Sequence, residues 1–329
     1  PHLVHTSPSS EPGSDRSGSQ SLQPTTLSTM TYTLKQLKYF VAVAEFNSVT
    51  KASRKVHVSQ PSVSAAITQL ENALNAKLFV RHQARGLTMT PVGRELLGPA
   101  KRLLAQAENL EQTAGELTDG LGGTLTIASL LTLAPVLLPK TFRAMHDDYP
   151  ALQINCHELN LGELSAGLRE GLFELAITYD LDLGNDIAFT PVCTYPTYVI
   201  LPEKHPLARR KKINLRMLRN EPMILLDLPQ TRDYFLDLLR DSDADPEIVY
   251  RTQSPTMVMG MVAAGFGYSL LNARPKTMQT LDGGNYCAVE IADKISPLIM
   301  GIASLGSNTF SRAGQTFLQR FSELHSAAA

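Results

Sequence analysis

The sequence has few cysteines and no long apolar run, and each absence excludes a class of protein. The three cysteines, Cys156, Cys193 and Cys287, are scattered and odd in number, which is typical of a reducing compartment and not of a disulfide framework. The apolar runs are short and broken by proline, glycine or charge, so no segment is expected to span a bilayer. We therefore expect a cytoplasmic protein without membrane contact.

Catalytic and metal-ligating patterns are also missing from the sequence. No pairing of a nucleophile with a general base can be read from it, and His146, His157 and His205 lack metal-ligand spacing. The sequence therefore predicts neither an enzyme nor a metal or cofactor site. An α/β enzyme remains an alternative class without a supporting set of residues.

The chain is long enough for more than one folded domain. It has 329 residues, of which 43% are hydrophobic, so it can bury a small core and a larger one. Residues 1–29 are rich in Ser, Pro, Thr and Gly and are expected to be a disordered leader, either added to the natural chain or an upstream extension of it. The predicted boundaries are a small domain over 30–90, a linker helix over 91–119 and a larger domain over 120–329.

A tight corner at His57 and Val58 joins two short helical patterns between Ser48 and Asn75. The small Ser53 stands where the two helices would touch. Apolar residues recur at helical spacing at Ala52, Val56, Val58, Val63 and Ala66. This arrangement predicts a helix-turn-helix, with a preceding helix over 33–46 packed against it. An ordinary helix pair in a core or bundle is the alternative.

The second helix of this pair begins with small polar residues. Ser59 is placed to cap it, and Pro61 lies in its first turn, where a missing N–H is harmless. In helix-turn-helix proteins this end of the helix faces base edges in the major groove, where glutamine suits adenine and serine suits either base. The predicted base-reading residues are Ser59, Gln60, Pro61, Ser62 and Ser64.

Charge separates this segment from the rest of the chain. Eight basic and two acidic residues lie between Met30 and Val92, a net charge of +6, whereas the whole chain carries −1. A basic domain on an acidic remainder is typical of phosphate binding. Lys51, Arg54 and Lys55 are the predicted phosphate contacts, and double-stranded DNA is the predicted partner.

A β-hairpin wing is predicted from Leu78 to Thr90. Gly86 tolerates the unusual dihedral angles of a hairpin tip. Arg81, His82 and Arg85 are predicted to reach the DNA backbone or minor groove from this wing. A solvated charged loop is the alternative.

A long helix is predicted from Pro91 to about Thr118. Its apolar residues recur every three or four positions, at Val92, Leu96, Ala100, Leu103, Ala107, Leu110, Ala114 and Leu117. Such a heptad seam is normally buried against a partner helix, so the predicted dimer contacts are Leu96, Leu103, Leu110 and Leu117. Packing against the chain's own second domain is the alternative.

The stretch from Tyr32 to Leu97, with its motifs LKYFVAVAE, HVSQPSVS and QLE, resembles the winged helix-turn-helix of LysR-type transcriptional regulators. The resemblance implies that the long helix dimerises the DNA-binding domains, that dimers can pair into tetramers, and that RNA polymerase is a further partner. Ala65, Ala66 and Thr68 stand where relatives often carry Arg or Lys. Phosphate contact is therefore expected mainly from the first helix of the pair and the wing.

Beyond Asp119 strands and helices alternate, and this order predicts an α/β fold with parallel sheets. We expect one lobe at about 120–190 and 297–329, a second at about 191–296, and a cleft between them. This part resembles the LysR-type effector domain, which is similar to type 2 periplasmic binding proteins. The expected fold class is therefore mixed: a helical winged domain, a linker helix and a two-lobed α/β domain.

Polar residues at the predicted ends of strands and starts of helices are candidates for effector binding. They are Ser129, Thr132, Thr178, Thr231, Arg232, Thr252, Gln253 and Ser254. Their helix-starting positions, and a guanidinium able to grip a carboxylate, suggest a small ligand bearing a carboxylate. Helix capping is the alternative for the Ser, Thr and Gln residues, and an exposed ion pair for Arg232.

These observations predict a sequence-specific DNA-binding transcriptional regulator that is controlled by a small-molecule effector bound between the two lobes. The competing class is a solute-binding module whose helical domain serves only for assembly. The +6 segment favours the regulator, because assembly alone does not require a basic surface.

Overall fold

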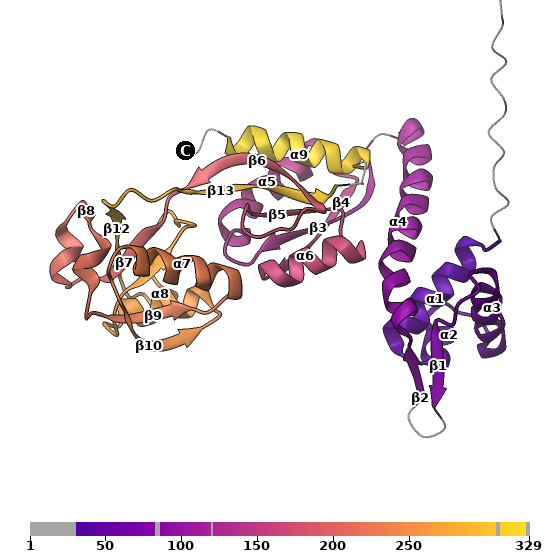
Figure 1. Cartoon of the computed structure of the whole chain (residues 1–329). Coiled ribbons are helices and arrows are strands. Elements are labelled where there is room, and N and C mark those ends of the chain that lie inside the picture. Colours follow the sequence, from indigo (N-terminus) through magenta and orange to yellow (C-terminus); the bar gives the residue numbers. More distant parts are fainter. Residues whose placement is uncertain (1–30, 83–85, 120, 307–309, 327–329) are drawn as a thin grey trace, which may run out of the picture.

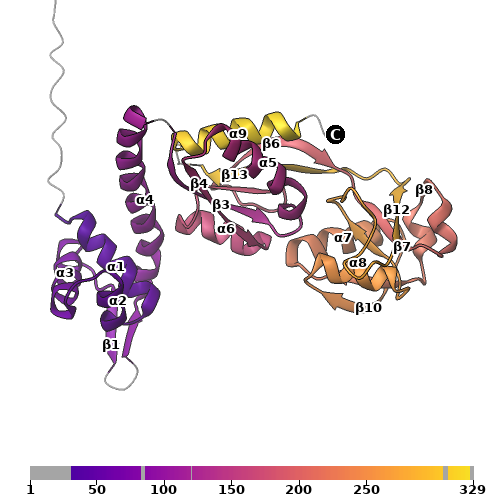
Figure 2. The ribbon, with the colours of Figure 1, turned by 180° about the vertical axis from the view of Figure 1, so that it is seen from behind.

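The computed structural model describes residues 31–82, 86–119, 121–306 and 310–326. A small N-terminal domain stands beside a long helix, and two larger lobes follow on the other side of that helix (Figure 1). The view from behind shows the same order of parts (Figure 2). The predicted leader over 1–29 lies outside the described residues.

The N-terminal domain is a helix-turn-helix with a hairpin wing, as predicted from the sequence. Three helices begin at side-chain caps, because Thr33, Ser48 and Ser59 each accept a hydrogen bond from the backbone N–H three residues on. The elements are α1 Leu34–Phe46, α2 Val49–Lys55, α3 Gln60–Ala73, β1 Phe79–His82 and β2 Gly86–Met89.

The corner between α2 and α3 depends on His57 and Ser53. His57 adopts a left-handed conformation with φ of 55°, which turns the chain sharply. The Val58 N–H then donates to the Ser53 carbonyl at 3.0 Å, and Ser53 itself is buried where the helices meet. A larger side chain at position 53 would push α2 and α3 apart.

Glu71 anchors the wing to α3, a role that the sequence did not reveal. Its carboxylate accepts hydrogen bonds from the N–H groups of Leu78 at 2.9 Å and Phe79 at 3.2 Å, and from Lys77 Nζ at 2.7 Å. Burial raises the pKa of Glu71, but these hydrogen bonds outweigh it and leave the pKa below its usual value. The wing is thus held by a buried, ionised carboxylate.

The linker helix α4 spans Pro91–Asp119 and contacts both neighbours. Near its start, Leu96, Ala100 and Leu103 pack into the core of the N-terminal domain. On another side Arg102 donates a hydrogen bond to the carbonyl of Arg169, which lies at the end of α6 Leu161–Glu170. The helix therefore has intramolecular contacts over the first part of its length.

The first lobe is a five-stranded mixed sheet with helices on both faces. α5 and α9 lie together on one face and α6 on the other (Figure 1). The strand order is β4-β3-β5-β13-β6, in which β3 runs parallel to β4 and β5 while β13 runs antiparallel to β5 and β6. The further elements are β3 Gly123–Leu130, α5 Ala134–Asp148, β4 Leu152–Leu159, β5 Leu175–Tyr179, β6 Ile187–Tyr195, β13 Leu298–Leu305 and α9 Arg312–His325.

The second lobe contains a four-stranded sheet of order β11-β7-β12-β8 and a parallel pair of β9 and β10. A backbone bridge from Met223 to Tyr268 ties the pair to the sheet. Its elements are β7 Tyr198–Pro202, η1 Pro206–Arg209, β8 Lys212–Ile213, η2 Leu215–Leu218, β9 Pro222–Leu226, α7 Pro229–Asp241, β10 Glu247–Thr252, α8 Pro255–Ala263, β11 Ser269–Leu271 and β12 Tyr286–Ile291.

The parallel pairing expected from the order of strands and helices is present among β3, β4 and β5 and in the pair of β9 and β10, but both lobes also contain antiparallel pairs. In the first lobe β13 runs against the parallel core, whereas β6 pairs antiparallel with β13 and so has the same direction as β3, β4 and β5. In the second lobe β7 pairs antiparallel with β11 and β12. β6 also stays paired with β13 as far as Tyr195, so the first crossing lies a few residues later than the expected boundary near 190. β13, which returns from the second lobe, therefore enters the first sheet in the opposite direction from the strands joined by helices.

No helix in the described part of the chain is both long and apolar enough to cross a bilayer.

Candidate DNA interface and effector cavity

The start of α3 presents the predicted base-reading residues at the surface. Ser59, Gln60, Pro61 and Ser62 are exposed, and Ser64 is half-buried. The hydroxyl of Ser59 caps the helix by accepting from the Ser62 N–H at 3.3 Å, and it lies 2.7 Å from the Ser62 hydroxyl. This cap fixes the direction in which the first turn of α3 projects.

Gln60 is positioned by a residue of α2 that sequence reasoning missed. The Thr50 hydroxyl donates to Gln60 Oε1 at 3.2 Å. A carbonyl oxygen has two lone pairs, so Oε1 can still accept a second hydrogen bond while the amide N–H₂ donates. Thr50 therefore orients the Gln60 amide and leaves both of its polar ends able to form a further hydrogen bond.

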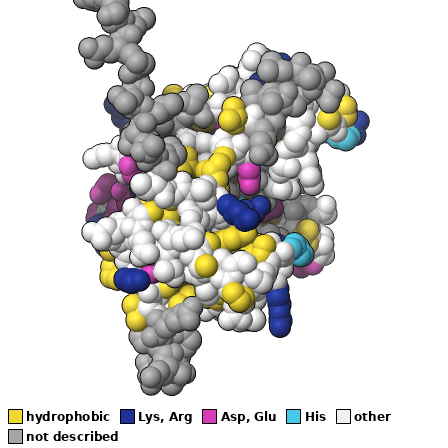
Figure 3. Space-filling view, turned by 90° about the vertical axis from the view of Figure 1, so that its right-hand side faces the viewer, with side chains coloured by type: hydrophobic (Ala, Val, Ile, Leu, Met, Phe, Trp, Pro, Cys, Tyr) yellow, Lys and Arg dark blue, Asp and Glu magenta, His cyan; other side chains and the backbone are white. Residues whose placement is uncertain are grey.

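Exposed basic side chains flank this helix end. Lys51, Arg54 and Lys55 lie on α2 and are all exposed. Figure 3 shows this end of the molecule, where the Lys and Arg side chains stand as separate groups among hydrophobic and other uncharged surface, with Asp or Glu beside some of them. Spaced point charges of this kind suit contacts with successive phosphates of a DNA backbone.

The wing residues are only partly described. Arg81 and His82 belong to β1, but their side chains are outside the described set, as is all of Arg85. The strand pairing from Phe79 with Met89 to His82 with Gly86 confirms the hairpin.

The four predicted dimer contacts on α4 are in different surroundings. Leu96 and Leu103 are partly buried against the N-terminal domain, whereas the side chain of Leu110 is 73% exposed. The side chain of Leu117 lies outside the described set. Among the described side chains of the seam, Leu110 is the most exposed, and Val92 at the start of α4 is 43% exposed.

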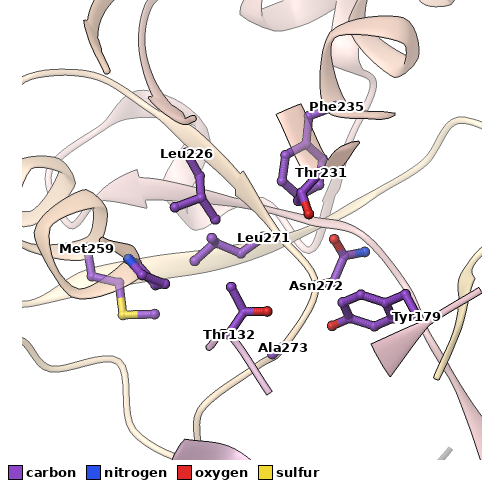
Figure 4. A pocket seen from close by; sticks show the side chains of 10 residues that line it. Thr132, Tyr179, Leu226, Thr231, Phe235, Met259, Leu271, Asn272 and Ala273 are labelled. Atoms are coloured by element: carbon purple, nitrogen blue, oxygen red, sulfur yellow. The ribbon is translucent and has the colours of Figure 1, made fainter. Parts of the chain in front are cut away.

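A small cavity of about 30 Å³ lies between the two lobes. The first lobe contributes Thr132 and Tyr179, and the second lobe contributes the remaining wall (Figure 4). The second-lobe residues are Leu226, Thr231, Phe235, Pro255, Met259, Leu271, Asn272 and Ala273. Three hydroxyls and one amide therefore line an otherwise apolar space, and among the described residues the tyrosine phenol is its one ionisable group.

Tyr179 supplies a buried hydroxyl that has no hydrogen-bond partner among the described residues. The side chain is 2% exposed, and Figure 4 shows its hydroxyl directed into the cavity on the side of Thr132. Burial, reinforced by nearby Tyr195 and other ionisable groups, raises the pKa of Tyr179 well above its usual value. The phenol therefore stays protonated and can donate.

Of the predicted effector residues in the first lobe, Thr132 lines the cavity. Ser129 and Thr178 are fully buried within their strands, and their hydroxyls donate to the neighbouring carbonyls of Leu130 and Tyr179. Successive strand residues point to opposite faces, so the residue next to Thr178 is the one that reaches the cavity. The signal that could have found Tyr179 is its place at the carboxyl end of a buried strand.

In the second lobe Thr231 lines the cavity but Arg232 does not. The Arg232 guanidinium donates to Asp233 at 2.7 Å and to Asp227 at 3.3 Å. The hydrogen bond from Arg232 lowers the pKa of Asp233, so both members of that pair are charged. Arg232 is therefore already neutralised by carboxylates of its own chain.

The predicted residues before α8 serve as its cap. The Ser254 hydroxyl accepts from the Met257 N–H at 3.3 Å, and the Thr252 hydroxyl accepts from the Ser254 N–H at 3.2 Å. Gln253 is exposed. None of these three lines the cavity, where the wall at this point is Pro255.

Two other helices, one at the cavity wall and one that begins two residues after a wall residue, start without a side-chain cap. α5 begins after Leu133 and α7 after Leu228, and the described structure has no side-chain cap bond at either. Thr132 precedes α5, and Thr231 lies in the first turn of α7. The uncapped N-terminus of a helix carries a partial positive charge, which favours an acceptor or an anion.

Asn272 joins the cavity to the strands that cross between the lobes. Its amide donates to the Thr197 hydroxyl at 2.9 Å, and Thr197 in turn lies 2.9 Å from the Tyr234 hydroxyl. Thr197 follows the end of β6, and Tyr234 lies on α7 one turn after Thr231. A change at the cavity can therefore reach the hinge between the lobes through α7 and Asn272.

The three cysteines are far apart in the fold. Cys156 is on β4 and Cys193 on β6, which are the opposite edges of the five-stranded sheet, and Cys287 is on β12 of the second lobe. Burial, with the nearby charge of Glu158, raises the pKa of Cys156 to about 11, and burial also raises that of Cys193. Among the described residues no cluster of three or more His, Cys, Asp or Glu side chains could hold a metal ion.

The chain matches two family profiles. Residues 34–94 match the lysR family of bacterial regulatory helix-turn-helix proteins, and residues 118–324 match the LysR substrate binding domain. The OxyR DNA-binding transcriptional dual regulator of Escherichia coli K12 is 30% identical over 73% of this chain and 79% of its own. The crystal structure of HinK, a LysR family regulator from Pseudomonas aeruginosa, is 35% identical, with a TM-score of 0.61 over 91% of this chain and 100% of its own.

A full-length OxyR variant from Pseudomonas aeruginosa is similar in fold, with a TM-score of 0.71 at 23% identity over 88% of this chain and 93% of its own.

Proposed function

Because the chain belongs to the LysR family of transcriptional regulators, and so is a DNA-binding regulator and not an enzyme, we propose that it reads an operator through α3 and responds to a small effector between its two lobes. The start of α3 supports the first part. Ser59 fixes its first turn and Thr50 holds Gln60, while Lys51 and Arg54 lie exposed beside it. Such a regulator acts in the cytoplasm, where its operator is found.

The division of labour between Gln60 and Lys51 tests this proposal. Fluorescence anisotropy would compare a promoter fragment from upstream of the protein's own gene with a scrambled duplex over a salt series. Gln60→Ala should weaken binding to the promoter by about 1–3 kcal/mol and reduce the preference over the scrambled duplex. Lys51→Ala should weaken both duplexes alike and reduce the salt slope by about one.

If both variants lose the same affinity for both duplexes, the assignment of base reading to Gln60 is wrong. Equal, weak binding of the unaltered protein to both duplexes, lost at moderate salt, would instead leave only a basic surface and favour the solute-binding alternative.

The effector part of the proposal is supported by the interlobe cavity. Its polar groups come from both lobes, so a ligand that contacts Thr132 and Thr231 together favours one angle between the lobes over another. Thr231 and Tyr234 share α7, and Tyr234 contacts the crossing strand at Thr197. Effector binding is thus expected to change the hinge, and through α4 the spacing of two DNA-binding domains.

A homodimer through α4, able to pair into a tetramer, completes the proposal. The exposed Leu110 on the seam supports a partner helix on the outer part of α4, while the first part packs on the chain's own domain. An isologous contact between two α4 helices would place two α3 helices on the two halves of a symmetric operator. Contact with RNA polymerase at the promoter belongs to the same proposal.

The hydrogen peroxide response named for several relatives is not proposed for this chain. Two relatives that are 29–30% identical to this chain are named hydrogen peroxide-inducible genes activators. Here Cys156 and Cys193 sit on opposite edges of one sheet, and both thiols have raised pKa values. A thiol with a raised pKa holds little of the reactive thiolate at neutral pH.

A further inference from the structure

The interlobe cavity contains an excess of hydrogen-bond donors. The Tyr179 hydroxyl is buried and has no partner in the described part of the protein, although an unpaired buried polar group is unfavourable. Tyr268 also has an orphaned hydroxyl, but the hydroxyl of Tyr179 differs because Tyr179 lines a cavity, where a ligand or a water can pair with it. The orphaned hydroxyl therefore points to a ligand atom that accepts a hydrogen bond at this place.

The surroundings of Tyr179 indicate that this acceptor carries negative charge. The uncapped start of α7 meets the cavity at Thr231, and Thr132 lies two residues before the uncapped start of α5, so two hydroxyl donors and the partial positive charge of α7 lie at the same space. In the part of the chain that the structure describes, no carboxylate lines the cavity to repel an anion. Several donors at uncapped helix starts can hold an oxyanion without a basic side chain.

The remaining wall sets the size and nature of the rest of the ligand. Leu226, Leu271, Met259 and Phe235 present only apolar surface. The cavity of about 30 Å³ has room for roughly two water molecules, because one water needs about 10–15 Å³ in this measure. A body of one or two methyl or methylene groups fits with slight separation of the lobes, whereas an aromatic ring requires a much wider opening.

We propose that the effector is a short-chain monocarboxylate of the size of acetate or propionate, with its carboxylate accepting from the hydroxyls of Tyr179, Thr132 and Thr231 and its alkyl end against Leu226 and Leu271. This inference rests on the proposed effector role of the interlobe cavity. Arg232 takes no part, because Asp227 and Asp233 already occupy its guanidinium. Tyr179 is the residue that determines specificity.

Two variants of the full-length protein separate ligand recognition from stability. Tyr179→Phe removes the cavity hydroxyl and keeps the ring. Tyr268→Phe is the matched control, because its hydroxyl is also buried and without a partner among the described residues but does not line the cavity. Both changes should leave the ligand-free protein folded and at least as heat-stable as the original.

The test measures thermal midpoints and binding isotherms with acetate, propionate, benzoate and acetamide at constant ionic strength set with sodium chloride. Acetate or propionate should raise the midpoint, whereas acetamide, a neutral molecule of similar shape, should not. Tyr179→Phe should weaken acetate or propionate binding at least tenfold, and Tyr268→Phe should leave it unchanged.

The proposal is overturned if acetamide binds as well as acetate, if benzoate alone binds, if Tyr179→Phe binds the acids normally, or if none of the four compounds binds. Promoter anisotropy in the same samples keeps the two proposals apart. Specific DNA binding without an acid response would overturn the ligand class and leave the regulator, whereas loss of DNA preference would count against the regulator itself.

Discussion

Removal of the Tyr179 hydroxyl should make the ligand-free protein more stable while it weakens the effector site. The ring of Tyr179 packs edge-on against Tyr195, with centroids 6.1 Å apart, and phenylalanine preserves that contact. The lost oxygen has no hydrogen bond to the described protein, so no interaction disappears with it. A buried unsatisfied polar group destabilises a fold by about 1–3 kcal/mol, and Tyr179→Phe should recover that amount.

Thermal denaturation followed by far-UV circular dichroism measures this gain, since the chain has no tryptophan to report by fluorescence. Each 1 kcal/mol corresponds to roughly 2–4 °C in the midpoint of a domain of about 200 residues. Tyr268→Phe should show a similar rise. A fall of several degrees for Tyr179→Phe alone would refute the reasoning, because it would show that the hydroxyl makes a stabilising bond in the folded protein.

Three further predictions concern other parts of the chain. Glu71→Ala leaves two buried wing N–H groups without their acceptor and should destabilise the DNA-binding domain by roughly 2–4 kcal/mol in urea unfolding; unchanged stability would contradict the anchoring role. Leu110→Glu should raise the dimer dissociation constant roughly tenfold or more in sedimentation, whereas Gln106→Glu, an equal charge at an exposed position of α4, should not. Burial, with the charge of nearby Lys140, lowers the pKa of His325. Below about pH 6.5 the unfolded chain therefore binds a proton that the folded chain does not, and the free energy of unfolding should decrease as the pH is lowered. His325→Gln should flatten that dependence, and an unchanged slope would exclude the assignment.

The helix-turn-helix could be predicted because its signals are local. Ser59 caps α3 through a bond to a residue three positions on, and Val63 and Leu70 repeat at helical spacing toward one core. The same holds for the extent of α4 and for the order of strands and helices beyond it. Local hydrogen bonding and side-chain periodicity act over a few residues, so a linear pattern contains them.

Sheet direction and the identity of the cavity residues could not be predicted in the same way. The order of strands and helices suggested parallel sheets, but β13 reaches the first lobe from the second and inserts between β5 and β6 in the antiparallel sense. Thr178 and Tyr179 both end a strand, and only the twist and pairing of that strand decide which one faces the other lobe.

The sequence by itself determined a basic winged helix-turn-helix, a long linker helix and a two-lobed α/β domain, because capping, periodicity and charge balance act along the chain. The tertiary structure alone decided that Glu71 anchors the wing, that Asp227 and Asp233 neutralise Arg232, and that Tyr179 carries an orphaned hydroxyl into the space between the lobes. Those facts depend on which residues meet across distant segments, and only the packing of the folded chain brings them together.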